Sequence, residues 1–598
     1  MRTSLARLLV PIVAAMALAA SMPAAPAAAA GIVYEVHYVK SVGGALIRVE
    51  IERDTRFDAA KQPVILTYSP YNSLNGSQPA ADGIAQQFVP QGYARAVADV
   101  LGTRGSTGCW DYGGRKEQQS GVDVVKYLAH LPWSNGNVGM TGVSYDGTTA
   151  TMVAATGIPE LKAIVPVAGI SHWYGYAYGN GVRYFLNTRA ATDEGFDTPL
   201  LFDFGLGDTV PTDPGDPHFA EAAQARAAEC GATEHTMQAY SREPDYGAFW
   251  KERDYLRAAR AGKFRAATLI VHGWQDYNVK QEEATDLYRA LEVDDPRTGR
   301  IEGAPFKMLW MTQSNHADGS GPGYLELLDD FWAQTLKGDD RGLPGRLPVT
   351  TLGRTHLGPL RAPTHEKAWP PPTTRDLTLH LGRSFDPIPG APQVGPVGSN
   401  GEIGTLELKP QNDGAGWSHV DDGTTTEEVT LRDPLNRTVD AGGQGLRGHG
   451  YYSLFHESAP LKDSVRLVGS ARLDAWVNAS SPDQQLDPLL VEVLPDGSLT
   501  LVERGFLNLS YRNGLSTADP ATGWMHATVT FLPQDYTFLK GSRIGLILQG
   551  SNTAWGVPGS AGLLSYADGP VQDVTKVGTR LILPIAGLPR DPSALIPR

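Results

Sequence analysis

The run Gly-Val-Ser-Tyr-Asp-Gly at residues 142–147 places a serine between an apolar stretch and a run of small residues. A buried strand, a sharp turn and then a helix is the context in which a serine acts as a nucleophile, because the turn lifts its hydroxyl to the end of the strand. Glycines suit this turn because a side chain there would clash. We therefore predict Ser144 as a nucleophile. The backbone N–H of Tyr145, the first of the helix, is the expected donor to an oxyanion. The motif departs from Gly-x-Ser-x-Gly, since Asp146 stands where the second glycine is usual and Gly147 follows it.

A serine hydroxyl is a weak nucleophile, so it needs a base, and the base needs an acid that orients it. In folds with this strand–turn–helix motif the acid and then the histidine follow the serine along the chain. Asp276 comes just after the apolar run at residues 268–271, and His316 comes just after the run at residues 306–311. These positions at strand ends predict Asp276 as the acid and His316 as the base.

Other residues compete for both roles. Asp276 can be read as an ordinary turn residue, which would leave Asp254 or Asp286 as the acid, although both lie in helix-like surroundings. His272 is the rival base, but it precedes the acid and lies at the strand end itself.

A second donor to the oxyanion is expected in the loop after an early strand, residues 64–67. That loop has no His-Gly-Gly run, but Tyr71 follows Pro70 there, and a tyrosine hydroxyl can donate to an oxyanion. The alternative is that Tyr71 only packs.

Short apolar runs alternate with helix-like stretches over residues 31–168 and 263–340, which predicts an α/β fold with a mainly parallel sheet, that of the α/β-hydrolases. The expected strands lie at residues 64–67, 94–100, 138–141, 163–167, 268–271 and 306–311, and helices are expected at 120–131 and 282–291. A final helix is expected to end at Gly338.

The alternation is interrupted over residues 169–262, which we interpret as an inserted helical cap above the active site, with a helix at 219–228. Aromatic residues crowd its start: Trp173, Tyr174, Tyr176, Tyr178, Tyr184 and Phe185. The alternative is a helical lobe that does not contact substrate.

Residues 345–598 read as short strands separated by turns, at 377–381, 471–477, 527–531 and 543–548, without convincing helices. This pattern predicts a β-sandwich domain. A GxGxxG run at residues 443–448 lies in this β-rich region, outside any βαβ unit, so a dinucleotide site is not expected there.

Residues 1–30 have the features of a cleaved signal peptide: Arg2 and Arg7, an apolar run, and three alanines at 28–30. A membrane anchor is the alternative, although the run is short for a spanning helix. We predict a secreted protein that is free of the membrane after processing. The net charge of −14 argues against a nucleic-acid partner.

The chain has two cysteines, Cys109 and Cys230. In an exported protein they can pair, and the alternative is two separate buried thiols. No spacing of cysteines and histidines suggests a zinc site, so we expect no metal and no cofactor.

The chain resembles the X-prolyl dipeptidyl aminopeptidase and cocaine-esterase-like family of serine hydrolases from about residue 31 to its C-terminus. The resemblance is strongest at residues 102–106, 140–145, 249–256 and 271–279. It implies a triad of Ser144, Asp276 and His316, an oxyanion role for Tyr71, and a C-terminal jelly-roll domain.

Two branches of that family compete. The post-proline peptidase branch is similar at residues 169–176, where the resemblance implies that Trp173 and Tyr176 flank a proline pocket. The esterase branch matches the triad and Tyr71 equally well. An aminodipeptidase must also bind the free α-amine of its peptide substrate, and Glu194 or Asp193 in the cap is the expected partner.

We therefore expect a secreted serine peptidase that removes Xaa-Pro dipeptides from free N-termini. The alternatives are a serine esterase or acylase of the cocaine-esterase type and, more remotely, a non-enzymatic carbohydrate-binding surface protein. The resemblance does not extend to the large N-terminal domain of the lactic-acid-bacterial peptidases, so the oligomeric state stays open.

Overall fold

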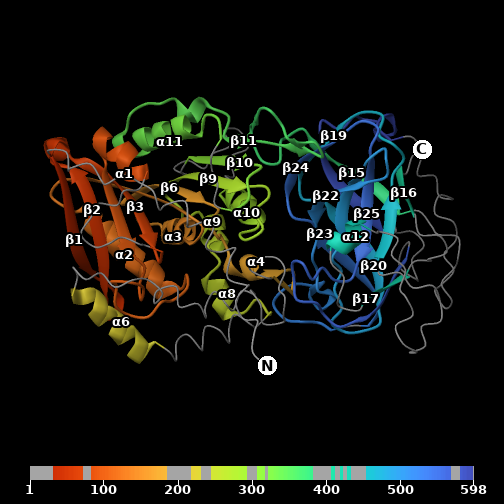
Figure 1. Cartoon of the computed structure of the whole chain (residues 1–598), viewed down its shortest axis with the longest axis horizontal. Coiled ribbons are helices and arrows are strands. Elements are labelled where there is room, and N and C mark those ends of the chain that lie inside the picture. Colours follow the sequence, from red (N-terminus) through yellow and green to blue (C-terminus); the bar gives the residue numbers. More distant parts are fainter. Residues whose placement is uncertain are drawn as a thin grey trace, which may run out of the picture.

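The computed structural model describes residues 31–71, 83–184, 217–230, 244–291, 306–316, 321–381, 406–410, 418–421, 427–432, 453–520, 522–567 and 579–596. A sheet flanked by helices lies at one end of the molecule and a β-rich half lies at the other (Figure 1). In the described part of the chain, none of the helices has both the length and the apolar character needed to cross a membrane.

The first sheet has ten strands in the order β1-β2-β4-β3-β5-β6-β9-β10-β11-β14. The strands are β1 (Ile32–Lys40), β2 (Leu46–Asp54), β3 (Gln62–Ser69), β4 (Ala94–Asp99), β5 (Ser134–Val143), β6 (Leu161–Val167), β9 (Ala267–Gly273), β10 (Lys307–Thr312), β11 (Val349–Thr351) and β14 (Thr364–Glu366). Neighbours from β4 to β11 are parallel, whereas β1, β2 and β14 pair antiparallel. The carboxyl ends of β3, β5, β9 and β10 therefore share one edge of the sheet.

Helices cover both faces of this sheet, which is why its central strands are apolar on both sides. In β3, Val64 and Leu66 belong to one hydrophobic core, which also contains Leu128, whereas Ile65 belongs to a second core together with Phe331. The helices are α1 (Gly83–Phe88), α2 (Arg115–Ala129), α3 (Tyr145–Ala154), α10 (Glu282–Ala290) and α11 (Tyr324–Trp332). After α11 a π-helical turn, Ala333–Lys337, ends at Gly338 with φ of 80°, as the sequence predicts.

The described part of the insertion comprises α4 (Trp173–Ala177), the short pair β7 (Tyr178–Gly179) and β8 (Val182–Arg183), α6 (Pro217–Glu229), α8 (Ala248–Glu252) and α9 (Leu256–Arg260). The predicted helix at 219–228 is confirmed as α6. The β7–β8 pair does not join the first sheet. Phe185 and the rest of residues 185–216 and 231–243 lie outside the described residues, and the role of the insertion as a cap stays a prediction.

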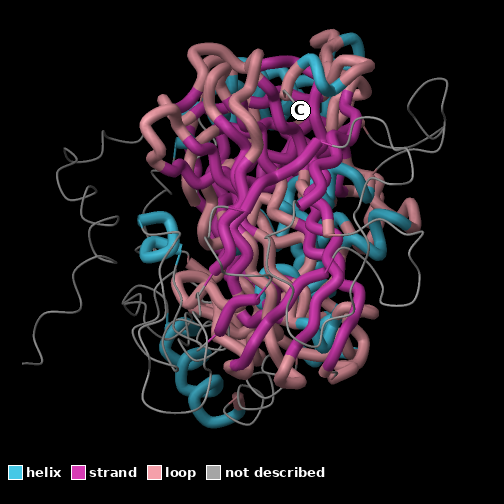
Figure 2. The backbone as a smooth tube through the Cα atoms, turned by 90° about the vertical axis from the view of Figure 1, so that its right-hand side faces the viewer, coloured by secondary structure: helices cyan, strands magenta, loops and turns pink. Residues whose placement is uncertain are grey.

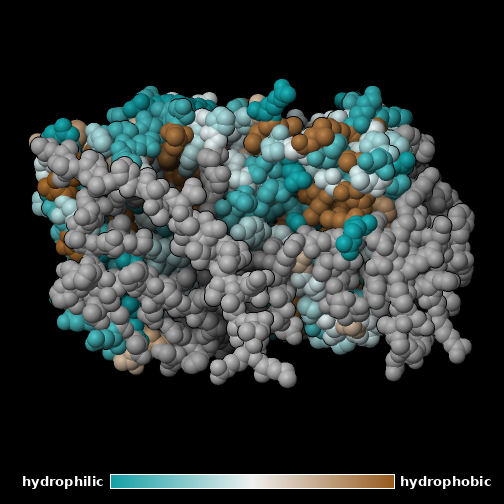
Figure 3. All heavy atoms as spheres, in the orientation of Figure 1, coloured by the Kyte–Doolittle hydropathy of each residue, from teal (hydrophilic) through white to brown (hydrophobic). Residues whose placement is uncertain are grey.

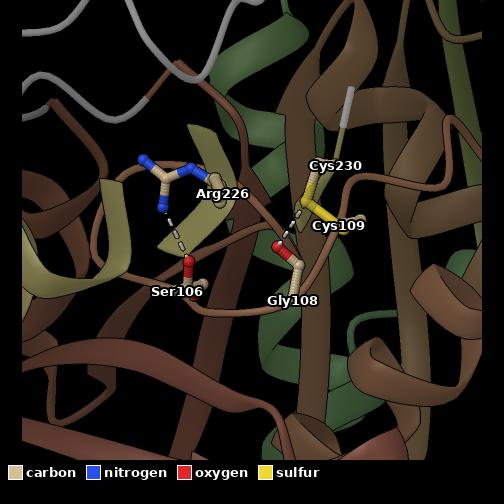
Figure 4. The surroundings of a disulfide bond; sticks show 5 residues. All are labelled: Ser106, Gly108, Cys109, Arg226 and Cys230. Atoms are coloured by element: carbon tan, nitrogen blue, oxygen red, sulfur yellow. Dashed lines mark hydrogen bonds between the residues drawn. A yellow bond between two sulfur atoms is a disulfide. The ribbon is translucent and has the colours of Figure 1, made fainter. Parts of the chain in front are cut away.

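Cys109 and Cys230 form a disulfide, with their Cα atoms 5.4 Å apart (Figure 4). The bond ties the end of α6 to the loop that follows β4. Arg226 on the same helix donates from Nη1 to the carbonyl oxygens of Arg104 (2.7 Å) and Ser106 (2.9 Å) in that loop. The sequence leaves the pairing of the two cysteines open, and the structure shows that they join the insertion to the loop after β4.

The β-rich half contains a second sheet system of fifteen strands (Figure 2), whose main path is β13-β12-β24-β19-β27-β15-β16-β18-β25-β21-β22. Its strands are β12 (Arg354–Thr355), β13 (Gly358–Pro359), β15 (Thr374–Leu381), β16 (Leu406–Pro410), β17 (Ser418–Asp421), β18 (Ser453–Glu457), β19 (Val465–Gly469), β20 (Arg472–Ala479), β21 (Leu489–Val493), β22 (Leu499–Arg504), β23 (Gly523–Thr530), β24 (Gln534–Phe538), β25 (Arg543–Gln549), β26 (Gly562–Ala567) and β27 (Arg580–Ala586). Alternate residues of β20 and β23 point into one apolar core, as in a β-sandwich.

One expectation for this half needs correction. A short helix, α12 (Glu427–Arg432), lies in the region where none was expected. β11 and β14, which follow the predicted boundary at residue 345, pair with the first sheet. Both strands have only three residues, too few to show a periodic pattern.

On the face drawn in Figure 3, the hydrophobic side chains that are not grey form separate patches among hydrophilic ones. Large exposed hydrophobic residues are also scattered along the sequence, as Leu325 and Leu357 illustrate. Such scattering is ordinary for a protein surface and indicates no particular partner.

Candidate active site

Ser144 stands between β5 and α3 in a strained turn. Its φ of 62° and ψ of −121° lie in a region that residues with a side chain rarely adopt. The backbone N–H of Ser144 donates to the carbonyl oxygen of Val167 at 2.9 Å, which fixes the turn against β6. The turn therefore presents the serine side chain at the carboxyl edge of the sheet.

The glycines of the motif are needed for steric reasons that the structure makes explicit. A Cβ atom at Gly142 would lie 2.2 Å from the Cβ of Asp146, and one at Gly147 would lie 2.8 Å from the backbone oxygen of Val167. The second close approach thus falls one residue later than in the common motif, at Gly147.

His316 joins the other two predicted residues in one hydrogen-bonded chain. Its Nε2 lies 2.9 Å from Ser144 Oγ, and its Nδ1 lies 2.8 Å from Asp276 Oδ2. A neutral imidazole that donates from Nδ1 to the carboxylate accepts at Nε2, so the serine hydroxyl donates to it. The residues come from the ends of β5, β9 and β10, and the structure brings together all three that the sequence singled out.

Asp276 is held in its ionised form. Burial opposes the charge, but hydrogen bonds from His272 and His316 outweigh it and lower the pKa of Asp276 to about 2. The other carboxylate oxygen, Oδ1, accepts from the backbone N–H groups of Asn278 (2.9 Å) and Val279 (3.0 Å). The carboxylate is therefore both charged and fixed in orientation.

His272, the rival base, has a different place. Its Nε2 lies 2.8 Å from the carbonyl oxygen of Val279 and 3.3 Å from Asp276 Oδ2, so this nitrogen carries the proton and donates. The rival acids also lie elsewhere: Asp254 accepts a hydrogen bond from Tyr246, and Asp286 lies on α10. The sequence did not identify His272 as a partner of Asp276, because a spacing of four residues brings side chains together on a helix, whereas His272 lies on β9.

The two predicted oxyanion donors flank the serine. Tyr71 exposes 41% of its surface, but its hydroxyl lies within hydrogen-bonding reach of Ser144. Desolvation of this hydroxyl, with the charge of Asp146 nearby, raises the pKa of Tyr71 above its ordinary value. The hydroxyl thus keeps its proton and can donate. The backbone N–H of Tyr145 is the first of α3 and has no intrahelical partner by position.

The side chain of Tyr145 supports the turn from below. Its hydroxyl donates to Glu117 (2.9 Å to Oε1) and accepts from Trp110 Nε1 at 2.9 Å. Burial raises the pKa of Glu117 to about 8. This buried network was not apparent from the sequence, because Glu117 occupies an ordinary helical position on α2.

Comparison with known proteins places this site in a family. Residues 44–318 match the model of the X-Pro dipeptidyl-peptidase (S15 family), and residues 350–569 match its C-terminal non-catalytic domain. The chain belongs to this family of serine hydrolases. A relative from Streptomyces avermitilis, named for Xaa-Pro dipeptidyl-peptidase activity, is 28% identical over 90% of this chain and 75% of its own length.

Solved structures agree on the fold. An aminopeptidase from a marine sediment thaumarchaeon has a TM-score of 0.65 at 16% identity, covering 95% of this chain and 99% of that one. An α-amino acid ester hydrolase has a TM-score of 0.63 at 18% identity, covering 98% of this chain and all (100%) of that one. This chain thus combines an α/β-hydrolase domain with a C-terminal β-rich domain.

Tyr176 and Trp173, which the sequence predicts to bind substrate, are both buried. Tyr176 is buried and donates to Asn278 Oδ1 at 3.0 Å, and burial, with the charge of Asp276 nearby, raises its pKa. Trp173 is fully buried, packs on Tyr176 with ring centroids 6.0 Å apart, and donates from Nε1 to another residue of the insertion. Glu194 and Asp193 lie outside the described residues.

Proposed function

We propose that this protein is a secreted serine peptidase that releases Xaa-Pro dipeptides from free peptide N-termini through a Ser-His-Asp acyl-enzyme mechanism. The observation that carries the proposal is the hydrogen-bonded chain through His316, with 2.9 Å to Ser144 and 2.8 Å to Asp276. These distances are those required of a nucleophile, its base and the acid that orients the base.

In the proposed reaction His316 takes the proton of Ser144 as Oγ attacks the scissile carbonyl carbon. Tyr71 and the N–H of Tyr145 donate to the oxygen that becomes negative. His316 then gives its proton to the leaving amine, and a water molecule, deprotonated in the same way, releases the acyl group. Asp276 stays charged throughout and stabilises the imidazolium.

Preference for proline is supported by the aromatic wall next to the nucleophile. The Tyr176 ring packs on Trp173, which in turn packs on the ring of Tyr145, the residue that follows the nucleophile. A rigid proline ring loses little conformational entropy when it is held against such a surface. The named activity of the Streptomyces relative supports the same substrate class. Glu194 remains the proposed partner of the substrate ammonium group.

Export is supported by two observations. Residues 1–30 have the composition of a signal peptide, and Cys109 and Cys230 are bridged. Disulfides of this kind form and persist in oxidising compartments outside the cytosol.

A second candidate is an esterase or acylase, because the fold also matches an α-amino acid ester hydrolase over nearly the full length of both chains. The triad and the oxyanion donors serve both reactions equally, since both proceed through an acyl-enzyme. The difference lies in how the leaving group and the substrate amine are bound.

A substrate panel distinguishes the two. Free Ala-Pro anilide, N-acetylated Ala-Pro anilide and a simple aryl ester are compared by kcat/KM, with Ser144→Ala as the blank. We expect the free anilide to exceed the blocked one clearly, because a buried carboxylate that binds the ammonium group is left unpaired by a blocked substrate. Equal rates on both anilides would refute the amine site. Ester cleavage without anilide cleavage would support the esterase.

A further inference from the structure

The loop that carries Asp276, residues 274–281, is held at both ends by the β-rich half. Gln281 donates from Nε2 to Glu503 Oε2 at 2.8 Å. Gln534 donates from Nε2 to the same oxygen at 3.2 Å and to the carbonyl oxygen of Trp274 at 3.4 Å. Glu503 lies on β22 and Gln534 on β24, and Figure 1 shows both strands in the part of the β-rich half that is nearer to the first sheet.

All three side chains are buried, with exposures of 3% for Gln281, 2% for Glu503 and 1% for Gln534. Hydrogen bonds in such surroundings are stronger than at the surface, and leaving one partner unsatisfied is costly. One carboxylate oxygen of Glu503 therefore links the start of the loop, through Gln534, to its end at Gln281.

Further contacts connect the loop of residues 274–281 to the β-rich half. Trp274 donates from Nε1 to Thr351 Oγ1 at 3.1 Å, and Thr351 donates to Asp535 Oδ2 on β24 at 2.9 Å. The ammonium group of Lys280 donates to the carbonyl oxygen of Asn278 at 3.2 Å and lies 5.4 Å from the ring centroid of Trp555 in the β-rich half.

The loop matters for the reaction because its backbone orients the acid. The N–H groups of Asn278 and Val279 hold one oxygen of Asp276, and the carbonyl oxygen of Val279 accepts from His272. A shift of the loop ends thus moves the carboxylate relative to His316. Displacements of about 1 Å in a catalytic constellation can cost about 10²-fold in rate.

We propose that Gln281, Glu503 and Gln534, which we call the acid-loop clamp, are positioning residues for Asp276. The β-sandwich domain, whose family model is described as non-catalytic, then sets the geometry of the triad through these contacts. The inference rests on the proposed function, since it presupposes that Asp276 orients His316 during turnover.

The test compares Glu503→Ala with Glu503→Gln and with a matched control, Glu492→Ala. Glu492 is also fully buried in the β-sandwich, and it accepts from Tyr536, Leu539 and Ser542 rather than from the acid loop. An activated aryl ester serves as substrate, because its hydrolysis needs the triad but no proline or amine pocket. We expect Glu503→Ala to lower kcat by about 10- to 100-fold with KM changed by less than about twofold.

Glu503→Gln keeps a side-chain oxygen for Gln281 and is expected to restore kcat to within about threefold of wild type. Glu492→Ala is expected to lower Tm while kcat of the folded protein stays within about twofold.

If Glu503→Ala does not fold, Gln281→Ala removes the same contact from the catalytic side and replaces it in the test. Wild-type kcat in the folded clamp variant would overturn the inference while leaving the proposed function intact. An equal fall in kcat for Glu492→Ala would also overturn it, since the effect would then be general to the domain. A wild-type protein that hydrolyses nothing and is not labelled at Ser144 by a fluorophosphonate would overturn both.

Discussion

The nucleophile and the acid are positioned by different means. Ser144 is held by its own neighbours: a positive φ, two glycines and the hydrogen bond to Val167 on the adjacent strand. The Asp276 loop lies in contact with residues from another domain, and Gln281 and Glu503 are 222 positions apart in the chain.

Because Ser144 and Asp276 are positioned by different means, we expect different substitutions to disturb each of them. A turn fixed by backbone strain and close approach depends on its local sequence and on the strand beside it. A loop fixed by contacts across domains depends on how those domains pack. In the proposed clamp, the β-sandwich thus contributes to the geometry of the triad in this chain.

The largest effect is expected on the locally positioned side. Ser144→Ala removes the nucleophile without disturbing the turn, so activity should fall by about 10⁴- to 10⁶-fold while the fold is kept. Circular dichroism checks that the fold is kept, and kcat on the aryl ester measures the loss of activity. Residual turnover within about tenfold of wild type would contradict the assignment of Ser144.

Tyr71→Phe is expected to have the next largest effect. Loss of one oxyanion donor lowers kcat by about 10²- to 10³-fold, because the hydroxyl acts only on the charge that develops in the transition state. KM should change little, and steady-state kinetics separate the two. A rate close to that of wild type would mean that Tyr71 only packs, and its role would be withdrawn.

The same comparison explains what could be predicted from the sequence. Ser144, Asp276 and His316 each follow an apolar run, and strand ends of a parallel sheet meet at one edge, so local patterns were sufficient to select them. The partners Glu503 and Gln534 lie in strands whose pattern reports burial only, and no local rule connects them to residue 276.

The fold shows the same limit. The buried parallel strands were found from their continuous apolar character, whereas β1 and β2 were not proposed as strands. β1 is only partly buried and mixes polar with apolar residues, so its sequence lacks the continuous apolar run by which the other strands were found. The disulfide likewise could not be decided, because pairing depends on a distance that only the fold supplies.

The smallest expected effect concerns the network beneath the nucleophile, and it is seen in stability rather than in rate. Burial raises the pKa of Glu117 from its ordinary value of 4.5 to about 8, so the folded protein keeps this proton where the unfolded chain loses it. The folded state then binds more protons between about pH 4.5 and pH 8, and the free energy of unfolding falls as pH rises through that window. The slope from this group is at most about 1.4 kcal/mol per pH unit.

Glu117→Gln mimics the protonated side chain and does not titrate, so the variant should gain stability relative to wild type as pH rises from 5 toward 8, with little difference at about pH 5. Urea unfolding of both proteins across this range measures the difference, in which groups common to both cancel. The hydroxyl of Tyr145 can still donate to the amide oxygen, so kcat should stay within about threefold. Parallel stability curves would show that Glu117 is ionised in the folded protein, and a large loss of kcat would show that the turn at Ser144 depends on that charge as well as on its own backbone.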